Sequence, residues 1–271
     1  MHVVAPASSA NLGPGFDTLG LALDLPFEVI AAPAAPAGYL VAEPTHPAAE
    51  AFQAAGGTGP LWWRSPIPPG RGLGFSGAAA VAGAFAAGVG VDETFEIAAR
   101  LEGHPDNAAP SAYGGVCVAA GGEVVRLDPP PEVEVVVWWP DTTTSTRRAR
   151  SVLPTMTSFD DAVFNVGRSS LLVAALATGR LDVLRVATED RLHQDVRLAR
   201  APRGREVLAN LLDAGALGAW VSGSGPTIAA LMRVGEGDHV LASLSGGRAR
   251  VLRIAATGVC EITEPDQNSR I

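Results

Sequence analysis

A run of small apolar residues from Ser76 to Ala87, SGAAAVAGAFAA, constrains the fold of this 271-residue chain more than any other stretch. Its residues are small and apolar on every side of a helix, which predicts a helix packed against neighbours on most of its faces. Ser76 stands near the start, where a hydroxyl favours helix initiation. Gly70, Gly72 and Gly74 alternate just before it. The stretch therefore predicts a glycine-rich loop that leads directly into a buried helix.

Such a loop is suited to binding phosphate. Glycines let the backbone approach an anion closely and point successive N–H groups at it, and the following helix adds the positive end of its dipole. No Gly-Lys-Ser/Thr follows, as a common P-loop would require, and no strand-loop-helix unit with a ribose-binding acid follows either. On these residues alone, a phosphate loop and a plain structural turn both remain open.

Strand patterns dominate the two ends of the chain, and helix patterns dominate its middle. The 91–103 helix has Asp92 as its expected cap and Gly103 as its stop. This order favours an α+β protein over a regular βαβ array. The tail at 263–271 is polar and expected to be frayed. Strands are expected at 2–7, 38–43, 132–140 and 248–256, with a strand running into a proline-rigid turn over 61–69 and a hairpin around Gly121-Gly122. The stretch 218–232 is expected to form a strand, a Gly/Ser turn and then a strand or the start of a helix. Helices are expected at 49–55, 76–87, 91–103, 160–179, 181–199 and 203–215.

Composition narrows the class of protein. The chain is 47% hydrophobic and 18% charged, with Arg favoured over Lys and a net charge of −8. A surface of that sign does not attract nucleic acid or anionic lipid, and no apolar run is long enough to cross a bilayer. The start does not resemble a signal peptide. Cys117 and Cys260 are too few for a disulfide framework and lack metal-site spacing. We expect a cytoplasmic protein of one large or two modest domains.

Three further stretches carry a family resemblance: PASSANLGPGFDTLGLAL from Pro6, EGHPDNAAPSAYGG from Glu102 and VSGSGPTIAAL from Val221. With the loop, they resemble the signature regions of the GHMP kinases, and the first two resemble those of homoserine kinases in particular. STRRARSVLP and DRLHQDVRLARAP also look like segments of that group. The resemblance spans roughly residues 3 to 233, with the motifs in the family's order.

The resemblance implies an α+β, two-domain GHMP kinase fold. An N-terminal nucleotide-binding domain like domain 2 of ribosomal protein S5 would cover 1–130, and a ferredoxin-like C-terminal domain 131–271. It also implies ATP-dependent phosphorylation of the side-chain hydroxyl of L-homoserine, which gives O-phospho-L-homoserine for threonine biosynthesis. ATP and Mg²⁺ would be the cofactors, and a homodimer is an expectation at the level of the family.

The resemblance assigns roles at the nucleotide end. Ser76 and Glu102 would hold magnesium, which prefers one or two carboxylates plus phosphate oxygens. Together with Asn107 they form the expected catalytic set. The turn SGSGPT, Ser222 to Thr227, would shape the site from the second domain. The expected phosphate loop consists of Pro68, Pro69, Gly70, Arg71, Gly72, Leu73, Gly74, Phe75, Ser76, Gly77 and Ala78.

The resemblance also assigns the acceptor end. Asp17 is suited to the amino group of homoserine and Asn107 to the reacting hydroxyl, with Asn11 beside them. Arg150 and Arg197 are suited to the carboxylate, because a guanidinium matches a carboxylate bidentately. His104, His193 and Asp106 are tempting as bases. Phosphoryl transfer through a loose transition state needs mainly positioning and charge neutralisation, so no general base is assigned.

The chain departs from the family pattern in two places. The usual Gly-Leu-Gly-Ser-Ser-Ala appears here as GLGFSG, with Phe75 and Gly77 as replacements. Residues 38–62 are short where homoserine kinases carry an Asn-rich segment that helps hold adenine. Two alternatives stay open: a GHMP kinase for another small hydroxy acid or amino acid, such as pantoate, and a non-catalytic member of the fold.

Overall fold

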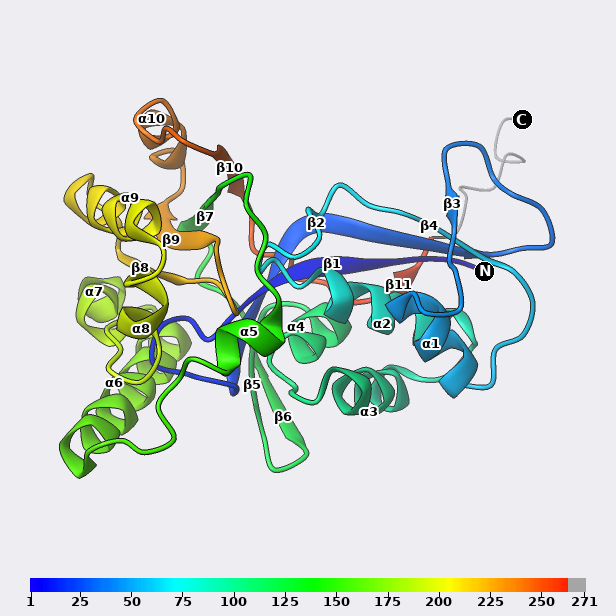
Figure 1. The fold of residues 1–271 in the computed structure, drawn as a ribbon, viewed down its shortest axis with the longest axis horizontal. Coiled ribbons are helices and arrows are strands. Elements are labelled where there is room, and N and C mark those ends of the chain that lie inside the picture. Colours follow the sequence, from blue (N-terminus) through cyan, green and yellow to red (C-terminus); the bar gives the residue numbers. More distant parts are fainter. Residues whose placement is uncertain (263–271) are drawn as a thin grey trace.

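A computed structural model describes residues 1–262 as two sheets, each with its own helices (Figure 1). The first sheet has the order β11-β1-β2-β4-β3, with β5 pairing both β2 and β6, and all its pairings are antiparallel. Its strands are β1 (His2–Ala10), β2 (Leu19–Ala31), β3 (Leu40–Val41), β4 (Leu61–Arg64), β5 (Val116–Ala120), β6 (Glu123–Leu127) and β11 (Cys260–Glu261).

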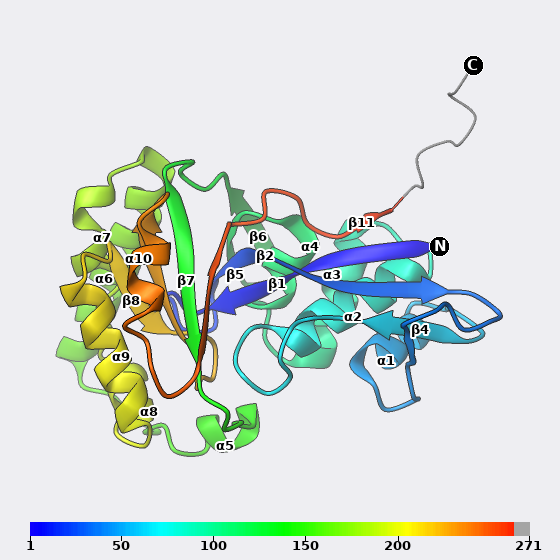
Figure 2. The ribbon, with the colours of Figure 1, turned by 90° about the horizontal axis from the view of Figure 1, so that it is seen from above.

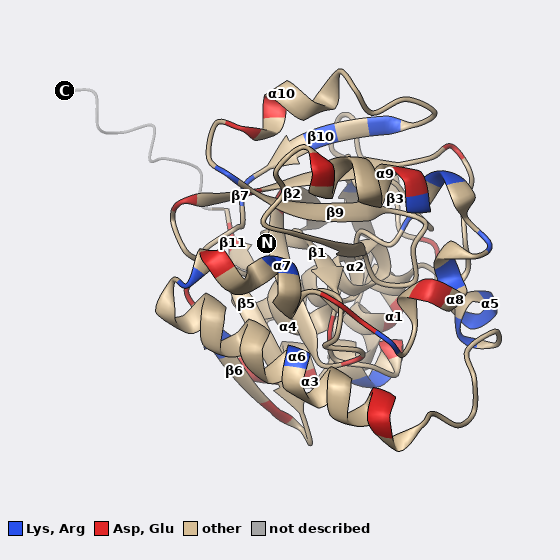
Figure 3. Ribbon diagram, turned by 90° about the vertical axis from the view of Figure 1, so that its left-hand side faces the viewer, with Lys and Arg blue, Asp and Glu red and all other residues tan. Residues whose placement is uncertain are grey.

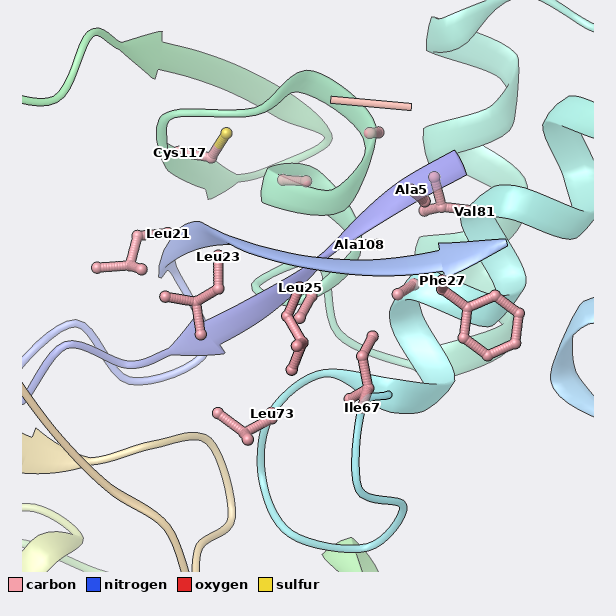
Figure 4. Close-up of a cluster of buried hydrophobic side chains, with 14 of the residues drawn as sticks. Ala5, Leu21, Leu23, Leu25, Phe27, Ile67, Leu73, Val81, Ala108 and Cys117 are labelled. Atoms are coloured by element: carbon pink, nitrogen blue, oxygen red, sulfur yellow. The ribbon is translucent and has the colours of Figure 1, made fainter. Parts of the chain in front are cut away.

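Four helices lie on one side of the long strands β1 and β2: α1 (Pro47–Ala54), α2 (Phe75–Ala86), α3 (Val91–Glu102) and α4 (Ala108–Tyr113). Helices α2 and α4 pack directly on the two strands, and α1 and α3 pack on α2. The core between these layers is aliphatic, with Leu21, Leu23, Leu25 and Phe27 of β2 in it (Figure 4). Helix α2 lies in the middle, and its residues from Gly77 to Ala84 are all buried. At Gly83 a Cβ atom would lie 2.0 Å from the carbonyl oxygen of Ala48, so small residues let α1 and α2 touch backbone to backbone.

The second sheet has the antiparallel order β10-β7-β9-β8. Helix α9 packs on β8 and β9 from the side that faces away from the first sheet (Figure 2), whereas the buried residues of α6 and α7 belong to the core that the two sheets share. Its strands are β7 (Val133–Trp139), β8 (Gly218–Val221), β9 (Ile228–Arg233) and β10 (Arg248–Leu252). The helices of this part are α5 (Thr146–Arg150), α6 (Phe159–Thr178), α7 (Leu184–Ala187), α8 (Gln194–Leu198), α9 (Pro202–Asp213) and α10 (Gly237–Leu241), and a 3₁₀ turn lies at Leu181–Val183.

The chain ends back on the first sheet. Ile254 forms an isolated bridge with Leu23, and β11 pairs with Val3 and Val4 of β1. The last described residues therefore belong spatially to the unit in which the chain begins. The division of the domains at 130/131 stays a prediction.

Most of the expected elements are confirmed: the buried helix α2, the hairpin β5–β6, the long helix α6, the helix α9, and the strand-turn-strand unit β8–β9. Gly103 ends α3 in a left-handed conformation, as expected. The expected cap is wrong, because α3 starts at Val91 with Gly90 as its N-cap and Asp92 lies inside its first turn. The 38–43 strand is confined to Leu40–Val41. The polar tail lies outside the described residues.

Two larger differences lie near the site. The expected helix over 181–199 is wrong: the structure has the 3₁₀ turn, α7, a loop at 188–193 and α8. The carboxylate of Asp190 interrupts the helix because it accepts hydrogen bonds from the backbone N–H groups of Leu192, His193 and Gln194. The 13-residue strand β2 was not predicted.

Candidate active site

The glycine-rich loop is fixed by backbone conformations that favour glycine. Gly70, Gly72 and Gly74 all have positive φ angles, of 67°, 79° and 67°. A Cβ atom at Gly72 would lie 2.4 Å from the carbonyl oxygen of Ser222, and one at Gly74 would lie 2.0 Å from Ser8 Oγ. The loop is therefore squeezed between β1 of the first unit and the 222–227 turn of the second.

Hydrogen bonds hold the loop from both sides. The backbone N–H of Ser8 donates to the carbonyl of Leu73 at 3.3 Å, and the hydroxyl of Ser222 donates to the carbonyl of Gly72 at 2.6 Å. The hydroxyl of Thr227 donates to the carbonyl of Arg71. These bonds use the carbonyl groups of the loop and fix its position. Helix α2 begins directly after the loop, at Phe75, with Gly74 as its N-cap.

Phe75 packs into the first unit. Its ring makes edge contacts with Phe27, Trp63 and His46 at centroid distances of 5.3, 5.6 and 6.0 Å. Trp63 in turn stacks on Phe27 and on His46. The aromatic side chain that replaces the family's serine thus joins a cluster over the short 38–62 region, beside the phosphate loop.

A cavity of about 120 Å³ lies against the loop. The hydroxyl of Ser76 donates to Oε2 of Glu102 at 3.0 Å, and burial raises the pKa of Glu102. Asp106 Oδ1 accepts from Asn107 Nδ2 at 3.2 Å, and Asn107 Oδ1 accepts from the hydroxyl of Ser8 at 3.0 Å. The cavity is lined by Gly70, Gly72, Gly74, Phe75, Ser76, Glu102, His104, Asn107, Thr144, Thr146, Gly223, Ser224 and Gly225.

His104 stands on the same wall. Its Nδ1 lies 3.1 Å from Oδ1 of the buried Asp106, and that hydrogen bond raises the pKa of His104. No arginine lines this cavity in the described part of the chain, and the sequence contains no lysine.

The expected acceptor residues gather next to this cavity. Asn11 and Asp17 both adopt positive φ angles, of 73° and 58°, a conformation that Asn and Asp reach more readily than other non-glycine residues. Asn11 Nδ2 donates to the carbonyl of Gly223 at 2.9 Å, and Asn11 Oδ1 accepts from the backbone N–H of Asp17 at 3.1 Å. Arg150 Nη2 lies 2.5 Å from Asp17 Oδ1, so α5 of the second unit is paired with the 11–17 loop of the first.

Arg197 approaches from α8 and is only 8% exposed. Its Nη1 donates to the carbonyl of Gly223 at 2.7 Å, while its Nε is buried without a hydrogen-bond partner. Burial lowers its pKa to about 10, so the side chain remains a cation at neutral pH. Both Arg150 and Arg197 lie over the ring of Phe16, at 5.4 and 5.5 Å.

His193 is engaged at both ring nitrogens. Nε2 lies 2.8 Å from the carbonyl oxygen of Gly13, to which it donates, and Nδ1 accepts from Arg197 Nη1 at 3.0 Å. Burial lowers its pKa. A ring that is 1% exposed and bonded at both ends orients Arg197 rather than serving as a base.

The structure thus brings together Ser76, Glu102 and Asn107 at the cavity, and Asn11, Asp17, Arg150 and Arg197 around Gly223 and Phe16. Six residues of the expected phosphate loop do not line the cavity. Leu73 and Ala78 are core residues, Gly77 packs on Asn107, and Arg71 donates to the carbonyl of Asp141. Pro68 and Pro69 also lie away from it.

Sequence reasoning missed several residues that support the site. Ser8 binds Asn107, and Thr144 and Thr146 line the cavity. Asn165 of α6 donates to Asp190 Oδ1 at 2.8 Å and accepts from the backbone N–H of Arg191. Asp190 lies shortly before QDVRL, where an acidic residue can cap a helix, and this position could have indicated its role. Nothing in the sequence around Asn165 indicates that its side chain binds Asp190.

The chain is similar to known proteins. The chain matches the GHMP kinases N terminal domain over residues 41–115 and the GHMP kinases C terminal domain over residues 172–246. The chain belongs to the GHMP kinase family. Among curated relatives, a homoserine kinase of Thermus thermophilus is 42% identical over 96% of both chains, and that of Moorella thermoacetica is 42% identical over 85% of this chain and 87% of the relative.

Solved structures agree. A homoserine kinase from Cytophaga hutchinsonii has a TM-score of 0.84 at 25% identity and covers 97% of both chains. A mevalonate kinase has a TM-score of 0.67 at 12% identity, which supports the fold alone, and it covers 94% of this chain and 99% of its own. The expected α+β GHMP kinase fold is confirmed. No helix of the described residues is long and apolar enough to span a membrane.

Proposed function

We propose that this GHMP kinase transfers the γ-phosphoryl group of ATP to the side-chain hydroxyl of L-homoserine, giving O-phospho-L-homoserine and ADP. The observation that carries the proposal is the position of Gly223. It lines the phosphate cavity, and its carbonyl accepts from both Asn11 and Arg197 of the acceptor group. The expected phosphate site and two side chains suited to an amino acid substrate therefore meet at Gly223.

The loop supplies the phosphate end. Positive φ angles at three glycines leave backbone N–H groups unused by the loop's own structure, and the dipole of the 12-residue helix α2 favours an anion at its start. Ser76 and Glu102 fit a magnesium site, because Mg²⁺ takes one or two carboxylates with phosphate oxygens and water. When bound, the ion would neutralise charge on the transferring phosphoryl group.

The acceptor end suits a zwitterion. Asp17 would bind the ammonium group, and Arg150 and Arg197 the carboxylate. Asn107 Oδ1 already accepts a hydrogen bond from Ser8, so a second lone pair on that oxygen is available to the acceptor hydroxyl.

Glu102 and the buried Asp106 already take part in hydrogen bonds with Ser76, His104 and Asn107. The proposal therefore assigns no general base, as a loose phosphoryl-transfer transition state allows.

A coupled assay of ADP release against a panel of acceptors tests the proposal. The panel contains L-homoserine, L-threonine, L-serine, pantoate and 4-hydroxybutyrate. We expect the highest kcat/KM with L-homoserine. A higher value with a hydroxy acid that lacks the amino group would make the chain a kinase for another alcohol. ATP binding without turnover of any acceptor would make it a non-catalytic member of the fold.

A further inference from the structure

A second cavity, of about 430 Å³, lies beside the phosphate cavity of about 120 Å³. It is lined by the 142–152 segment, which includes α5, by α8 and the residues after it, and by the turn between β8 and β9. Ser145 and Arg148, about one helical turn apart, line this cavity, whereas Thr146 lines the phosphate cavity and Arg150 belongs to the acceptor group. The second cavity therefore uses a face of α5 that the proposed reaction does not use.

The charge of this cavity has one sign. The charged side chains that line it are all arginines, and no carboxylate lines it in the described part of the chain. Arg148 comes from α5 and Arg197 from α8, and Figure 3 shows basic residues on α5, beside α8. Neither arginine takes part in an ion pair between described residues, and Nε of the buried Arg197 has no hydrogen-bond partner. A cavity lined by one sign of charge concentrates ions of the opposite sign, so this arginine cavity favours an anion.

Most of the remaining lining is apolar. Leu198 of α8, Val221 of β8 and Ile228 of β9 are buried side chains that line the arginine cavity, and Val152 lines it just after α5. Cavities of roughly 300–1,000 Å³ that combine apolar walls with a few polar groups are typical of small-molecule sites. The lining thus suits a ligand with an aliphatic body, and it offers no carboxylate to an ammonium group, which makes an amino acid a poor match.

We infer that the arginine cavity binds a small organic anion with an aliphatic body and no ammonium group, either a carboxylate or a phosphate monoester. Its anionic group would lie against Arg148 and Arg197, because a guanidinium matches either anion bidentately. Its body would cover the side chains of Leu198, Val221 and Ile228.

The shared arginine gives such a ligand a consequence. Arg197 lines the arginine cavity and also contacts Gly223 in the acceptor group. An anion bound here would use the charge that the acceptor carboxylate needs. This step rests on the proposed function: the anion should raise KM for L-homoserine and leave kcat unchanged, and homoserine should weaken binding of the anion to the same extent.

Isothermal titration calorimetry of the full chain tests the binding without reference to turnover. The probes are 4-methyl-2-oxopentanoate, isopentyl phosphate and leucine, which has the carbon skeleton of the oxo acid but carries an ammonium group. We expect saturable binding of at least one of the two anions, and which of them binds identifies the anionic group. In the series from butanoate to hexanoate, each added methylene group should raise the association constant about fourfold, because it leaves water for an apolar wall.

Two variants on one helix locate the site. Arg148→Glu should weaken binding of the anion at least about tenfold, since it replaces a charge-assisted contact by repulsion. Arg147→Glu makes the same change at the neighbouring exposed arginine, which does not line the cavity, and should leave the constant almost unchanged. An anion bound at the glycine-rich loop instead would not depend on Arg148.

Three results would overturn the inference: no saturable binding of either anion up to about 10 mM, equal losses of affinity in Arg148→Glu and Arg147→Glu, or leucine that binds as tightly as the oxo acid with the same dependence on Arg148. The calorimetry decides the inference even if homoserine is not the acceptor. A failure of the proposed function, seen in the ADP-release assay, is therefore distinguishable from a failure of the anion site.

Discussion

Arg197 holds a positive charge where almost no water reaches it. Its hydrogen-bond partners, the Gly223 carbonyl and the His193 ring, are neutral, it lies over the face of Phe16, and its Nε has no partner. The charges of Arg150 and Asp17 also act on it. A buried charge without an ion pair is costly. None of the ion pairs between described residues includes Arg197, so a bound anion would lower the cost of burying its charge. A substrate carboxylate would be such an anion.

Replacing this arginine should therefore weaken acceptor binding selectively. We expect Arg197→Ala to raise KM for homoserine about ten- to hundredfold, the equivalent of one lost charge-assisted hydrogen bond. KM for ATP should change much less. Steady-state kinetics with each substrate varied in turn measures both constants. Arg200→Ala, an exposed arginine just after α8, is the control. A larger change in the ATP constant would assign Arg197 to the phosphate side.

Glu102 is the carboxylate that lines the cavity beside the glycine-rich loop in the described part of the chain. Glu102→Gln keeps the hydrogen bond from Ser76 but removes the charge, so we expect the fold to survive and kcat to fall about 10²–10³-fold, as for one preorganised electrostatic group. Circular dichroism checks the fold and a single-turnover assay the rate. Unchanged turnover at saturating magnesium would remove Glu102 from the site.

Phe75 and Ser76 are adjacent but should behave differently. The aromatic cluster of Phe75 predicts that Phe75→Ser lowers the melting temperature, while kcat of the folded fraction stays within about tenfold. Ser76→Ala should cost clearly more activity and little stability. Thermal melts and kinetics on both variants separate the two effects. A Phe75→Ser protein that is far more active than wild type would favour the non-catalytic interpretation.

At the scale of elements, two glycines inside helices, Gly83 and Gly167, have opposite surroundings. Gly83 of α2 is pressed against the backbone of α1, whereas Gly167 of α6 has open space around it. We expect Gly83→Ala to lower the free energy of unfolding by about 1–3 kcal/mol through overpacking. Gly167→Ala should raise it by about 0.5–1 kcal/mol through helix propensity. Urea unfolding of dilute protein measures both, and equal shifts would contradict the packing of α1 on α2.

The elements that were predicted correctly from the sequence are those indicated by residues close together in the chain. The all-small run indicated α2, the paired glycines indicated the β5–β6 hairpin, and Gly103 indicated the end of α3. The helix over 181–199 was wrong because apolar spacing continues through the loop, while Asp190 takes over the backbone N–H groups that a continuous helix would use. A local pattern of apolar residues does not show which side chain will accept hydrogen bonds from backbone N–H groups in place of the helical carbonyl groups.

The site was predicted from motifs, and its supporting contacts were not. Asn11, Asp17, Arg150 and Arg197 come from distant segments, and their meeting point at Gly223 depends on how two sheets dock. Ser8 and Asn165 are ordinary residues in their own elements. Their roles arise only from neighbours 99 and 25 residues away in the chain, which is a tertiary property.

At the scale of the whole molecule, buried polar contacts join the two sheets. Ser9 Oγ lies 2.7 Å from Ser222 Oγ and also accepts from Trp220 Nε1 at 3.0 Å. Removing either sheet would leave these buried groups unpaired, at a cost of about 1–3 kcal/mol each. The two units should therefore lose their structure together.

We expect a single cooperative unfolding transition in urea. Tryptophan fluorescence reports on both sheets, through Trp62 and Trp63 on β4 and Trp138, Trp139 and Trp220 on β7 and β8. Its transition should coincide with that of far-UV circular dichroism. Ser9→Ala should shift both midpoints together. Two separate transitions would mean that the sheets fold independently.

The pairing of β11 with β1 has a consequence for biosynthesis. Val3 and Val4 leave the ribosome long before their partners Cys260 and Glu261 have been synthesised. Until then the outer side of β1 is an unpaired strand edge, which is a template for association with other chains. The nascent protein must therefore carry an open edge from the emergence of β1 until β11 is available, and the emergence of β11 is the event that closes it.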